Sequence, residues 1–504
     1  MGRRLPLIAA GAAACALAPG PAPAAAPTTL YPGATTLLLS RSYRGGVPNG
    51  PSGAADISHD NRRARVVVFQ SDASDVVRHD GNGLTDVFMV HRKPPYDDRG
   101  TLWRVGENRL VSRGLGAQPS NGRSYAPVVD GDLKHPPRCV AFVSDASNLV
   151  AGDTNGVADA FVYSLRTRRI RRVSLSSSGE QANGPTYEVS ISGDCGRVAF
   201  TSTATNLALT HTRRRAWRSG VSAPVPAGHR QVYVRFLARR GRDRGFRGMT
   251  ALASVSGSRQ PGNGDSSAPA FARSGRALGY ASSATNLAPG DASPGTDVYV
   301  RELPRRFRHL DDGRGFQTLD PSTRLVSTAS VGTAGNGPSA SPSLSSSGRY
   351  VAYETWASDL LPGDAAGVQD VGRADMSRSP PTQALVSKTQ SAAANGSSGS
   401  PSISDAGHFV AFESAATNLR MFPYFASDPN GVPDVYLGIL GYGSASDESL
   451  ESDNRFASSP SGAPRISARG NYIVFESADR RMDTSIPNPD VPQVYLRWTL
   501  PQVK

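Results

Sequence analysis

The stretch CVAFVSDASNLVAGDTNGVADAFVY, residues 139–163, decides the fold, because most of the chain repeats it. It consists of an apolar run suited to a β-strand, a long polar loop closed by D-x-N-G-x-x-D, and a second apolar run. The first run occurs seven times, each time with a central aromatic residue: Phe69, Phe142, Phe200, Tyr280, Tyr353, Phe412 and Phe475. The second run recurs with it. A repeat of about 70 residues therefore organises the chain.

Two further short runs complete each repeat. One precedes the aromatic run, as in PSIS at 401–404, and one follows the second run, as in RLVS at 109–112 and 324–327. In six of the seven repeats, nine residues separate the serine near the end of the fourth run from the next Asn-Gly or Ser-Gly pair. This constant spacing supports one register of four strands per repeat. Four-stranded units in series are typical of a β-propeller.

The two ends of the repeat region complement each other. The region begins with TTLLLS at 35–40, a fourth strand without the preceding three, and ends with QVYLRW at 493–498, a third strand without a fourth. An N-terminal strand that completes the last blade closes the ring and leaves no unpaired sheet edges there. We therefore predict an all-β fold: a seven-bladed β-propeller of four-stranded blades, closed by the N-terminal strand.

Length and charge are consistent with one large repeat domain, which we place at residues 27–504 of the 504. Lys and Arg exceed Asp and Glu by 13, which favours acidic partners electrostatically. Arginines cluster at 166–172, 213–218, 239–247 and 305–308. Two interpretations remain open for these clusters: a solvated arginine-rich surface, or a face that binds a polyanion.

Residues 1–26 have the order of a secretory signal peptide. Arg3 and Arg4 precede an apolar run that ends in the small-residue stretch PAPAAAP. We expect an exported protein, secreted or held in the cell envelope, with lipid attachment at Cys15 as the alternative. After removal of the signal only Cys139 and Cys195 remain, in neighbouring repeats. They could form a disulfide or stay as two buried thiols.

The acidic loops are the candidate metal sites. Three repeats carry the full D-x-N-G-x-x-D pattern, so the candidate calcium ligands are Asp80, Asn82, Asp86, Asp153, Asn155, Asp159, Asp428, Asn430 and Asp434. Carboxylate and amide oxygens around a glycine turn resemble part of a calcium loop. The alternative is that Asp and Asn hydrogen bond to the backbone of a tight turn. We expect no cofactor besides calcium in these loops.

The A-T-N-L and A-S-N-L segments, with Asn148, Asn206, Asn286 and Asn418, recur just after the aromatic run. A substrate site would break the symmetry of the repeats. We therefore interpret these asparagines as loop architecture.

At the level of the repeat, the sequence resembles the TolB-type, WD-repeat-like β-propellers. SPSISDAGHFVAF at 400–412 is similar to that family's S-P-x-x-S-x-D-G core, and DVYL at 434–437 is similar to its following strand. The resemblance covers about residues 35–498 and implies the propeller fold. It implies little about function, because the family includes periplasmic scaffolds, sensor ectodomains and domains appended to peptidases.

No nucleophile elbow, H-E-x-x-H, P-loop or CxxC pair occurs in the sequence. The leading hypothesis is therefore an exported, non-catalytic binding or scaffold module for a protein or polysaccharide ligand, monomeric and without a nucleic-acid or membrane-spanning role. The first alternative is a carbohydrate-active lyase or hydrolase with a dispersed site at the central channel. It requires His, Arg, Asp or Glu side chains that converge there and break the seven-fold pattern. The second alternative is a polyanion binder that uses the arginine loops.

Overall fold

The computed structural model describes residues 36–499 except 62, 95, 97–102, 209–220, 222, 238–247, 292, 294, 304–321, 365–366, 420–427, 429, 442–443, 454, 487 and 489. The predicted signal peptide and three of the arginine clusters, at 213–218, 239–247 and 305–308, lie wholly or mostly outside the described residues. No helix in the described part is long and apolar enough to span a membrane.

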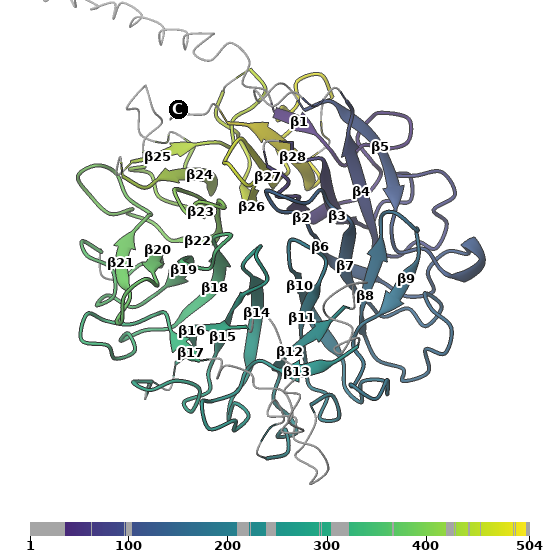
Figure 1. Cartoon of the computed structure of the whole chain (residues 1–504). Coiled ribbons are helices and arrows are strands. Elements are labelled where there is room, and N and C mark those ends of the chain that lie inside the picture. The colour runs from purple at the N-terminus through teal and green to yellow at the C-terminus, as the bar shows by residue number, and fades with distance from the viewer. Residues whose placement is uncertain are drawn as a thin grey trace, which may run out of the picture.

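Seven four-stranded antiparallel sheets surround a central axis (Figure 1). The predicted seven-bladed all-β propeller is confirmed. Blade 1 comprises β2 (Ser52–Ile57), β3 (Val66–Ser71), β4 (Asp86–Arg92) and β5 (Val105–Leu110). Blade 2 comprises β6 (Ser124–Val129), β7 (Cys139–Ser144), β8 (Asp159–Ser164) and β9 (Ile170–Arg172). Blade 3 comprises β10 (Thr186–Ile191), β11 (Arg197–Ser202), β12 (Gln231–Phe236) and β13 (Thr250–Leu252). A 3-10 turn, η1 (Leu115–Ala117), connects blade 1 to blade 2.

Blades 4 to 7 repeat the same order. Blade 4 comprises β14 (Ser266–Phe271), β15 (Ala277–Ser282), β16 (Asp297–Glu302) and β17 (Thr323–Leu325), and blade 5 comprises β18 (Ser339–Leu344), β19 (Tyr350–Thr355), β20 (Asp370–Asp375) and β21 (Thr382–Leu385). Blade 6 comprises β22 (Ser398–Ile403), β23 (Phe409–Ser414), β24 (Asp434–Ile439) and β25 (Ser444–Asp447). Blade 7 comprises β26 (Ser461–Ile466), β27 (Tyr472–Ser477), β28 (Gln493–Trp498) and β1 (Thr36–Leu38).

Strand β1 closes the ring. It pairs antiparallel with β28, and Leu37 lies opposite Leu496. The last sheet therefore has the order β1-β28-β27-β26, in which the first strand of the chain is its outermost strand (Figure 1). This pairing removes the sheet edge that β28 would otherwise expose.

The core lies between neighbouring blades. One cluster, for example, joins Val66 and Val68 of blade 1 to Val140 and Phe142 of blade 2. The aromatic residues of the repeat face each other within a blade, as Phe142 and Phe161 do with ring centroids 5.8 Å apart. Such pairs contribute about 0.5–1.5 kcal/mol beyond the area they bury.

A buried serine ties the third strand to the fourth in every blade. Its hydroxyl donates to the first residue of the third strand: Ser112 to Asp86, Ser174 to Asp159, Ser254 to Gln231, Ser327 to Asp297, Ser387 to Asp370, Ser449 to Asp434, and Ser40 to Gln493. The same hydroxyl accepts the next backbone N–H, as from Val298 at 3.0 Å. This relay accounts for the constant position of the serine in the sequence. Blade 6 differs: the nine-residue spacing selects Ser452, which pairs with Thr484, whereas the serine of the relay is Ser449.

The Asn-Gly pairs hold neighbouring loops together. Asn121 donates its side-chain nitrogen to Ser147 and accepts the Ser147 N–H, while Asn148 accepts the Asn121 N–H. Asn183 with Asn206, Asn263 with Asn286, and Asn395 with Asn418 repeat this arrangement. The asparagines of the A-T-N-L and A-S-N-L segments therefore stabilise loops, as predicted.

Candidate active site in the central channel

The central channel contains a cavity of about 360 Å³ lined by residues from the innermost strands of all seven blades. Most of its wall is small and weakly polar, with Ser190, Ser343 and Ser402 facing it. Five residues depart from this pattern: Asp56, His59, Glu188, Arg273 and Arg465. This volume lies in the range of small-ligand sites.

One end of the channel is narrowed by the turns between first and second strands. Their backbones are hydrogen bonded around the ring: Gly131 N–H to Gly193 O, Gly193 N–H to Arg273 O, Ser346 N–H to Asp405 O, and Asp405 N–H to Ala468 O. A Cβ on Gly193 would lie 2.8 Å from the Arg273 carbonyl oxygen. Glycine is therefore needed there for the two turns to approach.

His59 and Asp405 form a pair across two non-adjacent blades. His59 Nδ1 lies 2.7 Å from Asp405 Oδ1, and both side chains are buried. His59 stands in the turn of blade 1 and Asp405 in the same turn of blade 6, while blade 7 carries the small Ala468 at that position. A carboxylate on Nδ1 fixes the tautomer of the imidazole and directs its other nitrogen, Nε2, as the group that exchanges a proton.

Arg273 occupies the same turn position in blade 4. It donates from Nη1 to the Val129 carbonyl oxygen at 3.1 Å, and its Nη2 lies 4.0 Å from Asp56 Oδ1. Asp56 Oδ2 in turn accepts the Val129 N–H at 2.8 Å. Blades 2 and 3 have Gly131 and Gly193 at the corresponding position. These two residues have no side chain that could stand between the Arg273 guanidinium and Asp56.

The channel therefore brings together residues that the sequence analysis did not single out. His59, Arg273 and Asp405 are each the odd residue at one repeated turn position, where the other blades have Gly, Ser or Ala. The signal was present in the sequence: alignment of the seven turns exposes these three residues. They break the seven-fold pattern, which is the feature required for a dispersed catalytic site.

The acidic loops of blades 1 and 6 show the hydrogen bonds expected of tight turns. Asn82 donates its side-chain nitrogen to Asp86 Oδ2 at 2.7 Å, and Asn430 donates to Asp434 Oδ2 at 2.7 Å. Burial raises the pKa of Asp80 to about 6. Burial also raises the pKa of Asp86 to about 7 and that of Asp434 to about 6. Calcium binding by these loops stays one of the two interpretations from the sequence, next to that of hydrogen-bonded tight turns.

The acidic loop of blade 2 is closed by an arginine. Arg172, on the outer strand β9, donates from Nη1 to Asp153 Oδ1 at 2.8 Å and to Asp159 Oδ2 at 3.2 Å. Asn155 donates to the same Asp159 oxygen at 3.0 Å. The guanidinium thus lies between the two carboxylates that a cation would have to bind.

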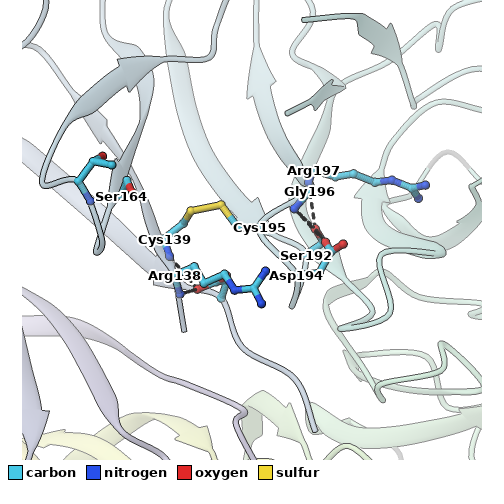
Figure 2. Close-up of a disulfide and its surroundings, with 10 residues drawn as sticks. Arg138, Cys139, Ser164, Ser192, Asp194, Cys195, Gly196 and Arg197 are labelled. Carbon is cyan, nitrogen blue, oxygen red and sulfur yellow. Dashed lines mark hydrogen bonds between the residues drawn. A yellow bond between two sulfur atoms is a disulfide. The ribbon is translucent and has the colours of Figure 1, made fainter. Parts of the chain in front are cut away.

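Cys139 and Cys195 form a disulfide, one of the two arrangements left open by the sequence (Figure 2). Their Cα atoms are 5.9 Å apart, and the bond joins β7 of blade 2 to the turn before β11 of blade 3. Asp130 is the only described acidic residue grouped with these sulfurs as a candidate metal ligand. Because the sulfurs are bonded to each other, neither is a thiolate.

No family model matches the chain, and no curated protein does. Solved structures share the fold at low identity. An oligogalacturonate lyase in complex with manganese is 10% identical, with a TM-score of 0.45, over 92% of this chain and 96% of that one. The oligogalacturonate lyase of Vibrio parahaemolyticus is 10% identical, with a TM-score of 0.46, over 94% and 98%. TolB from Acinetobacter baumannii is 9% identical, with a TM-score of 0.33, over 75% and 80%. The resemblance to TolB-type propellers is confirmed as a resemblance of fold.

The prediction of a non-catalytic module, and with it the inclination against an enzyme, is contradicted. Solved structures similar to this chain include the lyases above and, over 90% of this chain but 51% of that one, an acylaminoacyl peptidase with 8% identity and a TM-score of 0.44. The absence of a local catalytic motif in the sequence is a weak criterion for a propeller. A site assembled from separate blades needs no shared stretch of sequence, so a missing local motif decides little about it.

Proposed function

We propose that the protein is a carbohydrate-active enzyme with its active site in the central channel, and that the reaction is a lyase-type elimination on an acidic sugar. The observation that carries this proposal is the convergence of the His59–Asp405 pair with Arg273 in the channel cavity. Elimination needs a base and a cation that neutralises the sugar carboxylate. These three residues supply that combination.

In this mechanism Arg273 binds the carboxylate of the sugar, with Asp56 and the Val129 carbonyl oxygen holding the guanidinium. Because Arg273 neutralises the charge of the sugar carboxylate, the proton on the adjacent carbon becomes more acidic. His59 Nε2 removes that proton as a general base. The electron pair forms a carbon–carbon double bond while the bond to the glycosidic oxygen breaks. That oxygen takes up a proton from water, and the His59 imidazolium then returns its proton to the solvent. Asp405 is a positioning residue that stabilises the imidazolium through Nδ1.

A hydrolase accounts for fewer of these features. Glycoside hydrolysis commonly uses two carboxyl groups that flank the scissile bond. Here Asp405 faces His59, and Asp56 accepts the Val129 N–H beside Arg273. Asp405 and Asp56 therefore serve other side chains of the site, and the third carboxylate of the channel, Glu188, accepts the Ala268 N–H at 2.9 Å. The oligogalacturonate lyases named above carry an acidic saccharide in their name.

The test is incubation of the mature protein with polygalacturonate and other uronate polymers, followed by the ultraviolet absorbance of the unsaturated product. We expect turnover that falls at least about 100-fold in His59→Ala, the effect of removing a general base. Arg273→Lys should raise KM more than it lowers kcat, because it removes bidentate carboxylate binding but keeps the charge.

His135→Ala is the matched control. His135 also pairs through Nδ1 with an aspartate, Asp132, at 2.9 Å in a first-to-second-strand turn, but it does not line the cavity. Its removal should leave turnover unchanged. Absence of turnover on every uronate polymer, or equal activity of His59→Ala and the wild type, would contradict the proposal.

A further inference from the structure

A second and larger cavity, of about 1170 Å³, lies between blades 1 and 2. We call it the rim groove. Its walls are the loop at 77–82 and strand β5 of blade 1, the connection at 113–119, and the hairpin at 168–170 of blade 2. None of these segments contributes to the channel cavity.

The rim groove is strongly cationic. Arg78, Arg109, Arg113, Arg168 and Arg169 line it. All five are exposed, and the structure gives none of them an ion pair with a described carboxylate. Among the described lining residues the only acidic one is Asp80, and burial raises its pKa to about 6. Unpaired guanidinium groups around one concavity attract an anionic ligand.

Several of these arginines are already held in place. Arg113 donates from Nε to the Ala117 carbonyl oxygen at 3.1 Å, and the Arg78 guanidinium lies 5.3 Å from the ring centroid of Tyr43. Arg168 has a φ of 55°, a left-handed conformation that is costly for a residue with a Cβ. Preorganised donors lose less entropy when a ligand binds.

Aliphatic side chains form the rest of the surface. Leu110, Val150 and Ile170 lie in the lining, and Leu115 at its margin is 51% exposed. Tyr163 is the only aromatic residue among the described lining residues. Sugar rings pack their C–H faces on flat aromatic surfaces, of which the groove offers little. Aliphatic side chains of a peptide match it better.

From this combination we propose that the rim groove binds an acidic peptide segment of a partner protein, with carboxylates on the arginines and aliphatic side chains on the floor. The arginine cluster at 166–172 thereby gains a specific role, since Arg168 and Arg169 belong to it. This site is separate from the channel, and its occupation does not depend on the proposed enzymatic activity.

The test is fluorescence anisotropy with a fluorescein-labelled peptide of alternating glutamate and leucine. A peptide with glutamine in place of glutamate is the chemical control. We expect the glutamate peptide to bind and the glutamine peptide to bind at least about tenfold more weakly, because each charged contact between complementary groups strengthens the complex. Binding should also weaken as salt is added.

The matched variants are Arg109→Glu and Arg169→Glu against Arg171→Glu. Arg171 is an exposed arginine that lies two residues from Arg169 and does not line the groove. The two groove variants should each lose about tenfold in affinity, while Arg171→Glu and His59→Ala keep wild-type affinity. Equal losses in all arginine variants, no binding of the glutamate peptide, or its displacement by polygalacturonate at lower concentration than by unlabelled peptide would overturn the proposal.

Discussion

Arg172 Nη1 lies 2.8 Å from Asp153 Oδ1, so the acidic loop of blade 2 already contains a cation of its own. Both side chains are buried, with 8% and 4% of their surface exposed. The second carboxylate of the loop, Asp159, is fully buried and lies 3.2 Å from the same nitrogen. These contacts lead to predictions for the acidic loops of blades 1, 2 and 6.

Replacement of Arg172 should destabilise the protein strongly. In Arg172→Leu, Asp153 and Asp159 keep their burial but lose their counter-charge, which costs about 3–5 kcal/mol. Leucine is the residue that blades 1, 3, 4 and 5 carry at this register position, so the change tests charge rather than shape. Chemical denaturation at neutral pH measures the loss. Arg171→Leu, at an exposed neighbour, should change the free energy of unfolding by less than about 0.5 kcal/mol; similar losses in the two variants would contradict the argument.

Calcium should leave the thermal midpoint unchanged. The loops of blades 1 and 6 satisfy Asp86 and Asp434 with an asparagine and a serine donor each. A ligand that binds only the folded state raises the midpoint by mass action. Thermal unfolding with EDTA and then with millimolar calcium checks this expectation. A calcium-dependent rise that disappears in Asp434→Asn would show instead that these loops bind the ion.

The stability of the protein should fall as the pH rises from about 5 to about 8. Burial raises the pKa of Asp86 to about 7 and of Glu448 to about 7. Burial, with Asp364 beside it, raises the pKa of Asp370 to about 8. The folded state therefore binds more protons than the unfolded state across this interval, so the free energy of unfolding decreases with pH. Thermal midpoints measured across the interval give the slope.

Asp86→Asn is the matching variant for the pH series. An amide keeps an oxygen for the Ser112 hydroxyl, and blades 3 and 7 already have Gln231 and Gln493 in this role. The slope should become shallower in Asp86→Asn. Asp375→Asn should not flatten it, because Arg349 holds the pKa of Asp375 below its usual range. A wild-type midpoint that rises with pH would contradict the sign of the effect.

Periodic features of the fold could be predicted from the sequence, whereas the contacts made by the residues that break the repeat could not. The serines at the end of the fourth strand were visible because every blade needs the same hydrogen bond. Arg172 was missed because an arginine stands at this position in one blade only, and His59, Arg273 and Asp405 because each is single in its own repeat. A residue that acts through a partner from a distant blade leaves no local pattern. Only the ring geometry, which places blade 1 near blade 6, reveals the His59–Asp405 pair.

Loss of the Cys139–Cys195 disulfide should destabilise the folded state. The bond closes a loop of 56 residues, and in the chain-entropy model such a loop contributes about 4 kcal/mol by restricting the unfolded chain. The double variant Cys139→Ala/Cys195→Ala should therefore unfold at a lower denaturant concentration than the oxidised wild type.

Cys139 is buried, so the single variant Cys195→Ala, which also breaks the bond, separates loss of the cross-link from loss of packing at Cys139. Because both variants lack the bond, a reductant should lower the midpoint of the wild type only. A wild-type midpoint that is insensitive to a strong thiol reductant, with the cysteines verified as reduced by mass spectrometry, would show that the bond does not stabilise the propeller.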